Sequence, residues 1–235
     1  MFLYPLRERE LLLDLFQQLS GARMTYNYCR IGGVANDMPE NFDRDLLKAL
    51  DWIDKKMIDY EGMFDESRAF LMRMQDVGKV SAAAAMNLGM TGPNLRGSGA
   101  EIDIRKMDRY SVYDELDWRV MTEKDGDCYA RYRVRINEMR ESSNIIRDAL
   151  KKMPAGPVRV KAPKRPEKGT AFRRSEDPRG EAAFYLVSDG SQRPYRTRIK
   201  SPMFVNISAS PKLLIGYKIA DVPAIMGSID ICIGD

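Results

Sequence analysis

Apolar residues recur every three or four positions in three long segments of the chain. The segments run from Arg7 to Leu19, from Asn41 to Phe64 and from Asp127 to Met153. This period is typical of an amphipathic helix that turns one face to a core. Asn41 can cap the second helix, and Asp125 or Asp127 gives the third a negative start. Three long helices with one apolar face each predict a helical bundle.

Shorter patterns add a small β component. Glu181–Ser188 and Arg193–Ile199 alternate between apolar and polar residues on either side of Asp189-Gly190, which predicts a β-hairpin. Met24–Arg30 has the alternation of a short strand before a glycine turn. Further helices are expected over Ser81–Leu88, with Ser81 as N-cap, and over Pro211–Met226. The predicted fold class is therefore α+β, mainly helical.

One stretch interrupts this order. Residues 154–179 are rich in Pro, Lys and Arg, and we interpret them as a linker inside a single domain that covers residues 1–235. The basic part of this stretch contains one aromatic residue, Phe172, whereas a stacking surface for nucleic acid needs several. A solvated loop or a contact with a partner subunit is favoured, and no nucleic-acid partner is predicted.

The last segment, from Ile219 to Asp235, is almost entirely apolar but carries polar groups. Asp221, Asp230 and Cys232 lie within it. A carboxylate in such surroundings is costly unless it is hydrogen-bonded or paired. We expect Asp221 to form a buried pair with an arginine, and Asp230 and Cys232 become candidates for a functional site.

Composition excludes several kinds of chemistry. The chain has 235 residues, a net charge of +4 and no histidine, so it cannot by itself form a Ser-His-Asp or Cys-His centre. The three cysteines, Cys29, Cys128 and Cys232, are far apart, which favours reduced thiols and no metal site. No signal peptide is visible, and no apolar run reaches the roughly 18 residues of a membrane span.

The glycine-rich loop from Gly89 to Gly99 invites a phosphate-binding interpretation. It lacks the Lys-Ser/Thr pair of a P-loop and the spacing of a dinucleotide fingerprint. A structural loop in which the backbone closely approaches another segment is favoured. Arg96 in this loop is expected to be buried and paired, for instance with Asp103.

A set of motifs occurs in a fixed order along almost the whole chain. It comprises REREL at 7–11, SGARM at 20–24, RIGGV at 30–34, TGPNLRGSG at 91–99, DIRK at 103–106, YSVYDELDW at 110–118, GDCYARYRVRINEMRES at 126–142, PRGE at 178–181, FYLVSDGSQRPYR at 184–196 and ADVPAIMGSIDICIGD at 220–235. This ordered set resembles the family of the large, hydrogenase-like subunit of respiratory complex I (NADH-quinone oxidoreductase) and its archaeal deazaflavin-dependent relatives. The matching motifs correspond to the C-terminal part of that subunit.

The resemblance implies a fold shared with the large subunit of nickel-iron hydrogenases. It also implies a membrane-anchored oxidoreductase that passes electrons from a partner's iron-sulfur cluster to quinone, coupled to proton translocation. The chain would bind no redox cofactor or metal and would be inactive alone. Its partners would be the iron-sulfur subunit, other peripheral-arm subunits and a membrane subunit. It would lie peripherally on the cytoplasmic or matrix face of an energy-transducing membrane.

The resemblance also assigns site residues. Family positions that match Cys232 and Ile233 line the quinone cavity, and we extend the predicted wall to Asp230, Phe2 and Leu3. No catalytic residue is assigned, because the family's quinone-binding histidine and tyrosine belong to an N-terminal portion that this sequence lacks. A separate chain could supply that portion. The alternatives are a structural or assembly subunit without chemistry, and a relative of the membrane-bound nickel-iron hydrogenases.

Overall fold

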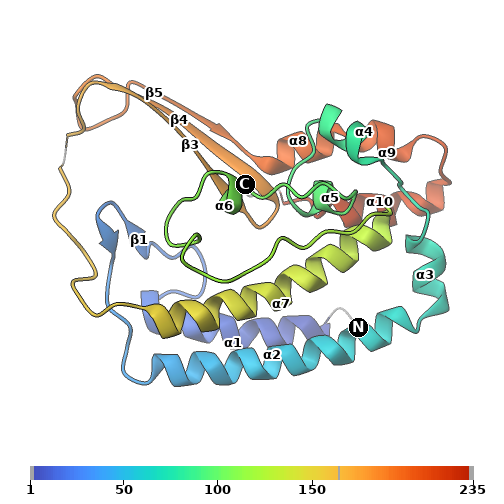
Figure 1. Ribbon diagram of the computed structural model, residues 1–235, viewed down its shortest axis with the longest axis horizontal. Coiled ribbons are helices and arrows are strands. Elements are labelled where there is room, and N and C mark those ends of the chain that lie inside the picture. The colour runs from blue at the N-terminus through green and yellow to red at the C-terminus, as the bar shows by residue number, and fades with distance from the viewer. Residues whose placement is uncertain (1–2, 164, 233–235) are drawn as a thin grey trace. The chain divides into compact units, whose positions relative to one another are not determined.

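The computed structural model describes residues 3–163 and 165–232 (Figure 1). In chain order, its elements are α1 (Leu3–Ser20), β1 (Cys29–Arg30), β2 (Gly33–Val34), α2 (Phe42–Asp65), α3 (Arg68–Met74), α4 (Ala82–Asn87), α5 (Pro93–Arg96), α6 (Ile104–Met107), α7 (Cys128–Lys152), β3 (Gly169–Asp177), β4 (Gly180–Ser188), β5 (Arg196–Lys200), α8 (Pro202–Ser208), α9 (Ser210–Leu214), the 3-10 turn η1 (Ile219–Asp221) and α10 (Val222–Ile229). The predicted α+β class and the three long helices are confirmed.

The chain divides into two compact units. The first contains residues 1–60 and 146–164, and the second contains 61–145 and 165–235. The prediction of a single domain stays a prediction. Among the residues that the structure describes, none of the helices combines the length and hydropathy that a membrane crossing requires.

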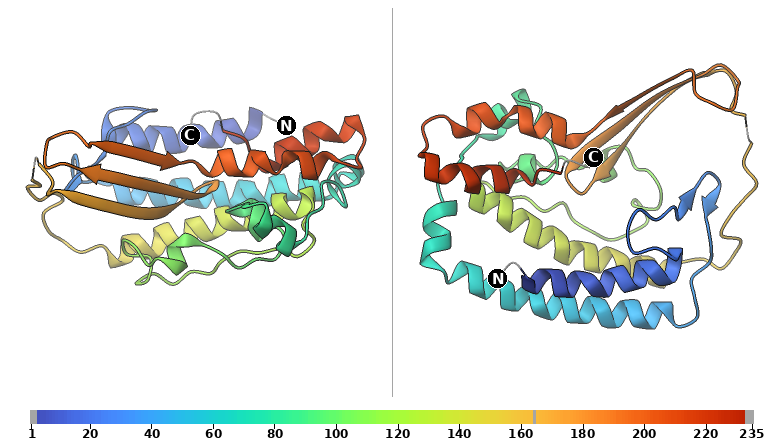
Figure 2. Two further views of the ribbon diagram at one scale, coloured as in Figure 1. Left: turned by 90° about the horizontal axis from the view of Figure 1, so that it is seen from above. Right: turned by 180° about the vertical axis from the view of Figure 1, so that it is seen from behind.

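In the first unit, α1 lies beside the N-terminal part of α2 (Figures 1 and 2). Leu15 of α1 is buried together with Phe42 and Ala49 of α2, and the leucines of both helices pack around them. The strand expected over Met24–Arg30 shortens to β1, which pairs with β2. Since β2 also binds the backbone at Val158, the hairpin belongs to this unit.

In the second unit, short helices enclose an apolar core. Ile225 and Ile229 of α10 are fully buried together with Leu213 of α9, Ala85 of α4 and Cys128 at the start of α7. The expected N-cap of α4 is confirmed, because the Ser81 hydroxyl accepts from the amide of Ala84. The core therefore brings the start of α7 against the C-terminal helices.

The sheet of the second unit has the antiparallel order β3-β4-β5. The predicted hairpin is confirmed as β4 and β5, with Tyr185 opposite Arg198. The linker prediction for residues 154–179 is wrong over Gly169–Asp177, which forms β3. Pairing explains the error, because every residue of β3 lies opposite one of β4 and the partner strand compensates for the polar composition of β3. Figure 2 shows the three strands lying side by side.

The single helix expected over Pro211–Met226 is also wrong. The segment splits into α9, η1 and α10, and a further helix, α8, precedes them. Gly216 has a φ of 91°, in the left-handed region that ends a helix. Pro202, Pro211 and Pro223 each lie in the first turn of a helix, where a missing amide costs nothing.

Candidate functional site

The glycine-rich loop positions the turn between β3 and β4. Gly92 has a φ of 64°, and a Cβ there would lie 2.5 Å from the carbonyl oxygen of Arg179. Next to it, the Thr91 hydroxyl accepts a hydrogen bond of 2.9 Å from the amide of Glu181. The expected close approach of backbone is therefore confirmed, and it fixes Arg179 at the tip of the turn.

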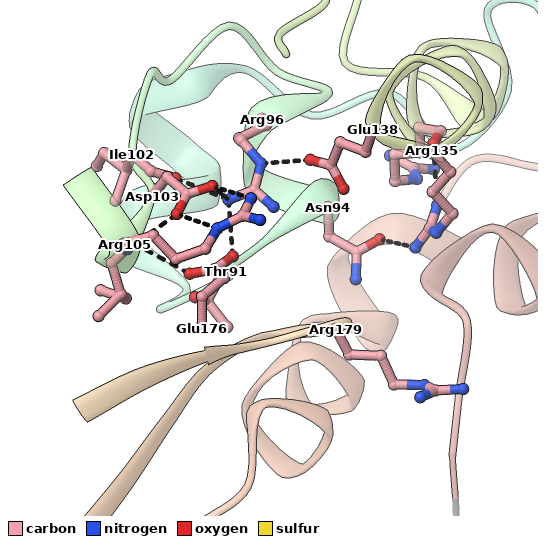
Figure 3. Close-up of polar contacts among 12 residues, drawn as sticks. Thr91, Asn94, Arg96, Ile102, Asp103, Arg105, Arg135, Glu138, Glu176 and Arg179 are labelled. Carbon is pink, nitrogen blue, oxygen red and sulfur yellow. Dashed lines mark hydrogen bonds and ion pairs between the residues drawn. The ribbon is translucent and has the colours of Figure 1, made fainter. Parts of the chain in front are cut away.

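Asn94 connects this loop to the C-terminal helix and to α7. Its Nδ2 donates to the carbonyl of Ile229 at 3.0 Å, and its Oδ1 accepts from Arg135 at 3.0 Å. Figure 3 shows Arg135 reaching Asn94 from α7, with Arg179 extending from the turn below them. Asn94 is fully buried, and its hydrogen bond to the Ile229 carbonyl fixes the last turn of α10.

Asp230 follows this last turn and has a φ of 59°, in the left-handed region. Its carboxylate Oδ2 lies 3.5 Å from Nε of Arg179 and 3.9 Å from Nε of Arg135. Arg179 Nε also donates to the Asp230 carbonyl at 3.1 Å. One carboxylate thus faces two guanidinium groups. Burial lowers the pKa of Arg135 to about 10, which still leaves it charged at neutral pH.

A second charged cluster surrounds Arg96. Its guanidinium is 2% exposed and contacts Glu138 at 2.6 Å, Glu176 at 2.8 Å and Asp103 at 3.3 Å. The expected pair with Asp103 is confirmed. Arg105 binds the same Asp103 carboxylate with two bonds of 2.9 and 2.7 Å. Figure 3 shows these side chains converging from α5, α6, α7 and β3.

A cavity of about 530 Å³ joins the two clusters. Arg96, Glu138 and Glu176 of one cluster line it, and so do Arg135 and Asp230 of the other. The cavity is therefore bordered by a site rich in carboxylate and a site rich in guanidinium.

Cys232 lines a different hollow. This groove of about 610 Å³ lies between β5, α8 and residues 231–232. Its apolar surface comes from aliphatic, aromatic and sulfur-containing side chains, and its cations come from β5. The residues that line it are Arg198, Ile199, Lys200, Ser201, Met203, Phe204, Ile207, Ile231 and Cys232.

The predicted wall residues are distributed over these places. Asp230 and Cys232 are two positions apart but line different hollows. Leu3 begins α1 in the first unit and is 74% exposed. Phe2 and Ile233 lie outside the described residues. The assignment of all five residues to the wall of a quinone cavity stays a prediction.

Two further expectations concern Asp221 and the cysteines. The arginine partner expected for Asp221 is confirmed, because Arg73 contacts its carboxylate at 2.8 Å. Asp221 is buried, but the Arg73 side chain is 56% exposed, so the pair lies at the surface. Cys29 is exposed and Cys128 is buried. In residues 3–163 and 165–232, no cluster of three or more His, Cys, Asp or Glu side chains is arranged to hold a metal ion.

Sequence reasoning missed Arg135, Glu138, Glu176 and Arg179. A signal existed for the first two, because a polar stripe with spacings of four, three and four residues runs along α7. Its members are Arg131, Arg135, Glu138 and Ser142. No comparable signal marked Glu176 and Arg179, which lie in or beside the strand that was interpreted as a linker.

Known proteins share similarity with this sequence over nearly its whole length. A subunit of NADH-quinone oxidoreductase from Dehalococcoides mccartyi is 44% identical over 99% of this chain and 64% of its own length. A subunit of F(420)H(2) dehydrogenase from Methanosarcina mazei is 43% identical over 99% of this chain and 64% of its own. A subunit of the chloroplastic NAD(P)H-quinone oxidoreductase from Chlorokybus atmophyticus is 41% identical over 100% of this chain and 66% of its own.

The chain thus spans slightly less than two thirds of the length of these relatives. A family model described as "Respiratory-chain NADH dehydrogenase, 49 Kd subunit" matches residues 1–168 and 160–235, which together cover the sequence. The chain belongs to the family of the 49 kDa subunit of respiratory-chain NADH dehydrogenase.

Proposed function

We propose that this chain forms part of the wall of a quinone cavity in a membrane-anchored respiratory oxidoreductase. The observation that carries the proposal is the groove beside Cys232. Ile199, Phe204 and Ile231 offer it an apolar surface, while Arg198 and Lys200 add cations. A quinone has an apolar tail and ring with two polar oxygens, and ligand pockets of this type combine apolar walls with a few polar groups.

The reaction divides between subunits. Reduction of quinone to quinol takes up two electrons and two protons, and we infer that an iron-sulfur cluster on a partner subunit supplies the electrons. The chain itself holds no cofactor. Its donor set does not fit a nickel site of four thiolates, because the C-terminal segment offers Cys232 alone, with Asp235 where the hydrogenase motif has its second cysteine. The names of its relatives, which are subunits of NADH-quinone oxidoreductase and of F(420)H(2) dehydrogenase, support a role in an oxidoreductase complex.

The remaining parts of the proposal follow from the family. The fold is related to the large subunit of nickel-iron hydrogenases. Partners are the iron-sulfur subunit, other peripheral-arm subunits and a membrane subunit. The complex couples electron transfer to proton translocation, and this subunit lies peripherally on the cytoplasmic or matrix face of the membrane.

The replacement Cys232→Trp in the assembled complex tests this function. A bulky side chain would fill the groove, so we expect quinone reduction to fall at least tenfold. Electron transfer to an artificial acceptor that accepts electrons from the iron-sulfur partner should stay unchanged. Cys29→Trp, at an exposed thiol of the first unit, is the matched control.

The same experiment separates the alternatives. Unchanged quinone reduction in an intact Cys232→Trp complex would contradict the proposal and favour a structural or assembly subunit. Nickel in stoichiometric amount, measured by elemental analysis of the complex, would instead indicate a hydrogenase relative.

A further inference from the structure

The cluster around Arg96 contains more carboxylate than guanidinium. Arg105 forms a two-bond ion pair with Asp103, at 2.9 and 2.7 Å, which neutralises that carboxylate. Arg96 is then shared mainly by Glu138 and Glu176, at 2.6 and 2.8 Å. Two glutamates therefore depend on one buried cation.

Such a pair favours retention of a proton. The Glu176 side chain is 5% exposed and that of Glu138 is 19% exposed, so water screens their repulsion weakly. Glu138 and Glu176 bind different nitrogens of one guanidinium, and buried carboxylates that share a single cation favour a proton on one of them. Burial raises the pKa of Glu138 and of Glu176, even though Arg96 opposes the shift in both.

The two glutamates differ in their hydrogen bonds. Glu176 uses both oxygens, one toward Arg96 and the other toward the amide of Ile104 at 3.1 Å. Glu138 binds Arg96 through Oε1, and within the described part of the chain its Oε2 has no hydrogen-bond donor. Glu138 also lines the 530 Å³ cavity. It is therefore the member of the pair that can exchange a proton with the cavity.

Around Asp230, the same cavity is bordered by more guanidinium groups than carboxylates. There, Arg135 and Arg179 surround the single carboxylate of Asp230. Guanidinium groups outnumber carboxylates at that site, whereas carboxylates outnumber guanidinium groups around Glu138. The charged and titratable groups that face Glu138 and its cavity are Arg96 of α5, Asp103 and Arg105 of α6 and its cap, Tyr113 of the following loop, Arg135 of α7, Glu176 and Asp177 of β3, and Asp230 after α10.

We propose that Glu138 and Glu176 hold one proton between them and exchange it with the cavity that reaches Asp230. The proposal rests on the proposed function, in which quinone lies in the groove beside Cys232, two residues after Asp230. The O–H bond of the Glu138 carboxyl breaks as the proton passes through the cavity toward Asp230 and on to the oxygen of a reduced quinone in the groove beside Cys232. That oxygen gains an O–H bond, and Glu138 becomes a carboxylate that regains its proton from solvent. The partner's iron-sulfur cluster supplies the electrons.

Infrared spectroscopy of the intact complex tests the held proton without quinone turnover. At neutral pH we expect a carbonyl band of a protonated carboxylic acid that shifts in deuterium oxide. Glu138→Gln and Glu176→Gln should each remove it, whereas the exposed control Glu101→Gln should retain it. Because the two variants are independent, failure of one to assemble leaves the other to decide. A missing band in the unmodified complex, or a band that survives in an assembled variant, would overturn the proposal.

Kinetics test the exchange. In Glu138→Gln, quinone reduction should fall at least fivefold and lose part of its pH dependence, with unchanged transfer to an artificial acceptor. An unaltered pH profile would overturn the proposal even if the band is present. Failure of the proposed function has a different signature, because it would leave the infrared band in place while Cys232→Trp reduces quinone normally.

Discussion

The buried and half-buried carboxylates of this molecule have different surroundings, because each has different donors and cations beside it. Asp230 and Glu138 line one cavity, but Asp230 lies between two guanidinium groups and Glu138 shares one with Glu176. Glu8 of the first unit is a third case. It is buried, yet Arg7, Trp52 and Tyr60 all donate to its carboxylate. Charge therefore depends on the donors that tertiary contacts supply.

Glu8 allows a prediction at this scale. Burial opposes its ionisation, but the hydrogen bonds from Arg7, Trp52 and Tyr60 lower the pKa of Glu8 below its usual value. A lowered pKa in the folded state stabilises the fold above the unfolded value of about 4.3, and this gain disappears as pH falls through the folded value. We expect Glu8→Gln to cost about 1–3 kcal/mol at pH 7 and progressively less below about pH 4.

Urea unfolding of both proteins across this pH range measures the difference. Glu10→Gln, two positions along the same helix but exposed, is the control and should show little change. A difference that stays constant down to about pH 2 would contradict the assignment.

At the scale of elements, the bounds of helix α7 follow from its N-cap residue and from the helical period of its apolar residues. Its predicted extent, Asp127 to Met153, agrees with the observed Cys128–Lys152 within one residue at each end. Its start is fixed by Asp127, whose Oδ1 accepts from the amide of Ala130 at 2.7 Å. Its Oδ2 accepts from the amide of Asp76 at 2.8 Å, which holds the end of α3 against the helix start.

The replacement Asp127→Ala should therefore cost more than an ordinary cap. It removes the cap of α7 and the bond to Asp76 together, and we expect a loss of about 2 kcal/mol in the free energy of unfolding. The exposed neighbour Asp125, an equal candidate from sequence, should change stability by less than about 0.5 kcal/mol when replaced by alanine. Equal effects in the two variants, measured by chemical unfolding, would contradict the structure.

At the scale of the whole molecule, the exposure of each cysteine depends on which segments pack around it. Cys128 is fully buried in the core of the second unit, whereas Cys29 is exposed and Cys232 lines the groove. Their spacing in the sequence carries no information on this order of exposure.

Labelling with a small maleimide should reproduce this order. We expect rapid modification of Cys29, slower modification of Cys232, and protection of Cys128 until the protein is unfolded. Peptide mass spectrometry after timed labelling measures each rate, and the unfolded chain, in which all three thiols react, is the control. Rapid labelling of Cys128 in the folded protein would show that this core is not formed as described.

The sequence by itself determined the long helices, the hairpin, the pair of Arg96 with Asp103 and an arginine partner for Asp221. Helical period, turn residues and the cost of an unpaired buried charge are local or general properties, and these suffice for such predictions. The sequence also carried the family motifs from which the function was inferred.

Only the tertiary structure decided the rest. Strand β3 forms because β4 lies beside it, and the helix expected over Pro211–Met226 breaks where the backbone at Gly216 turns left-handed. The two charged clusters unite residues separated by 51 positions, as for Arg179 and Asp230, or by 80, as for Arg96 and Glu176. No periodicity encodes such distances, since long-range pairing depends on how the whole core closes.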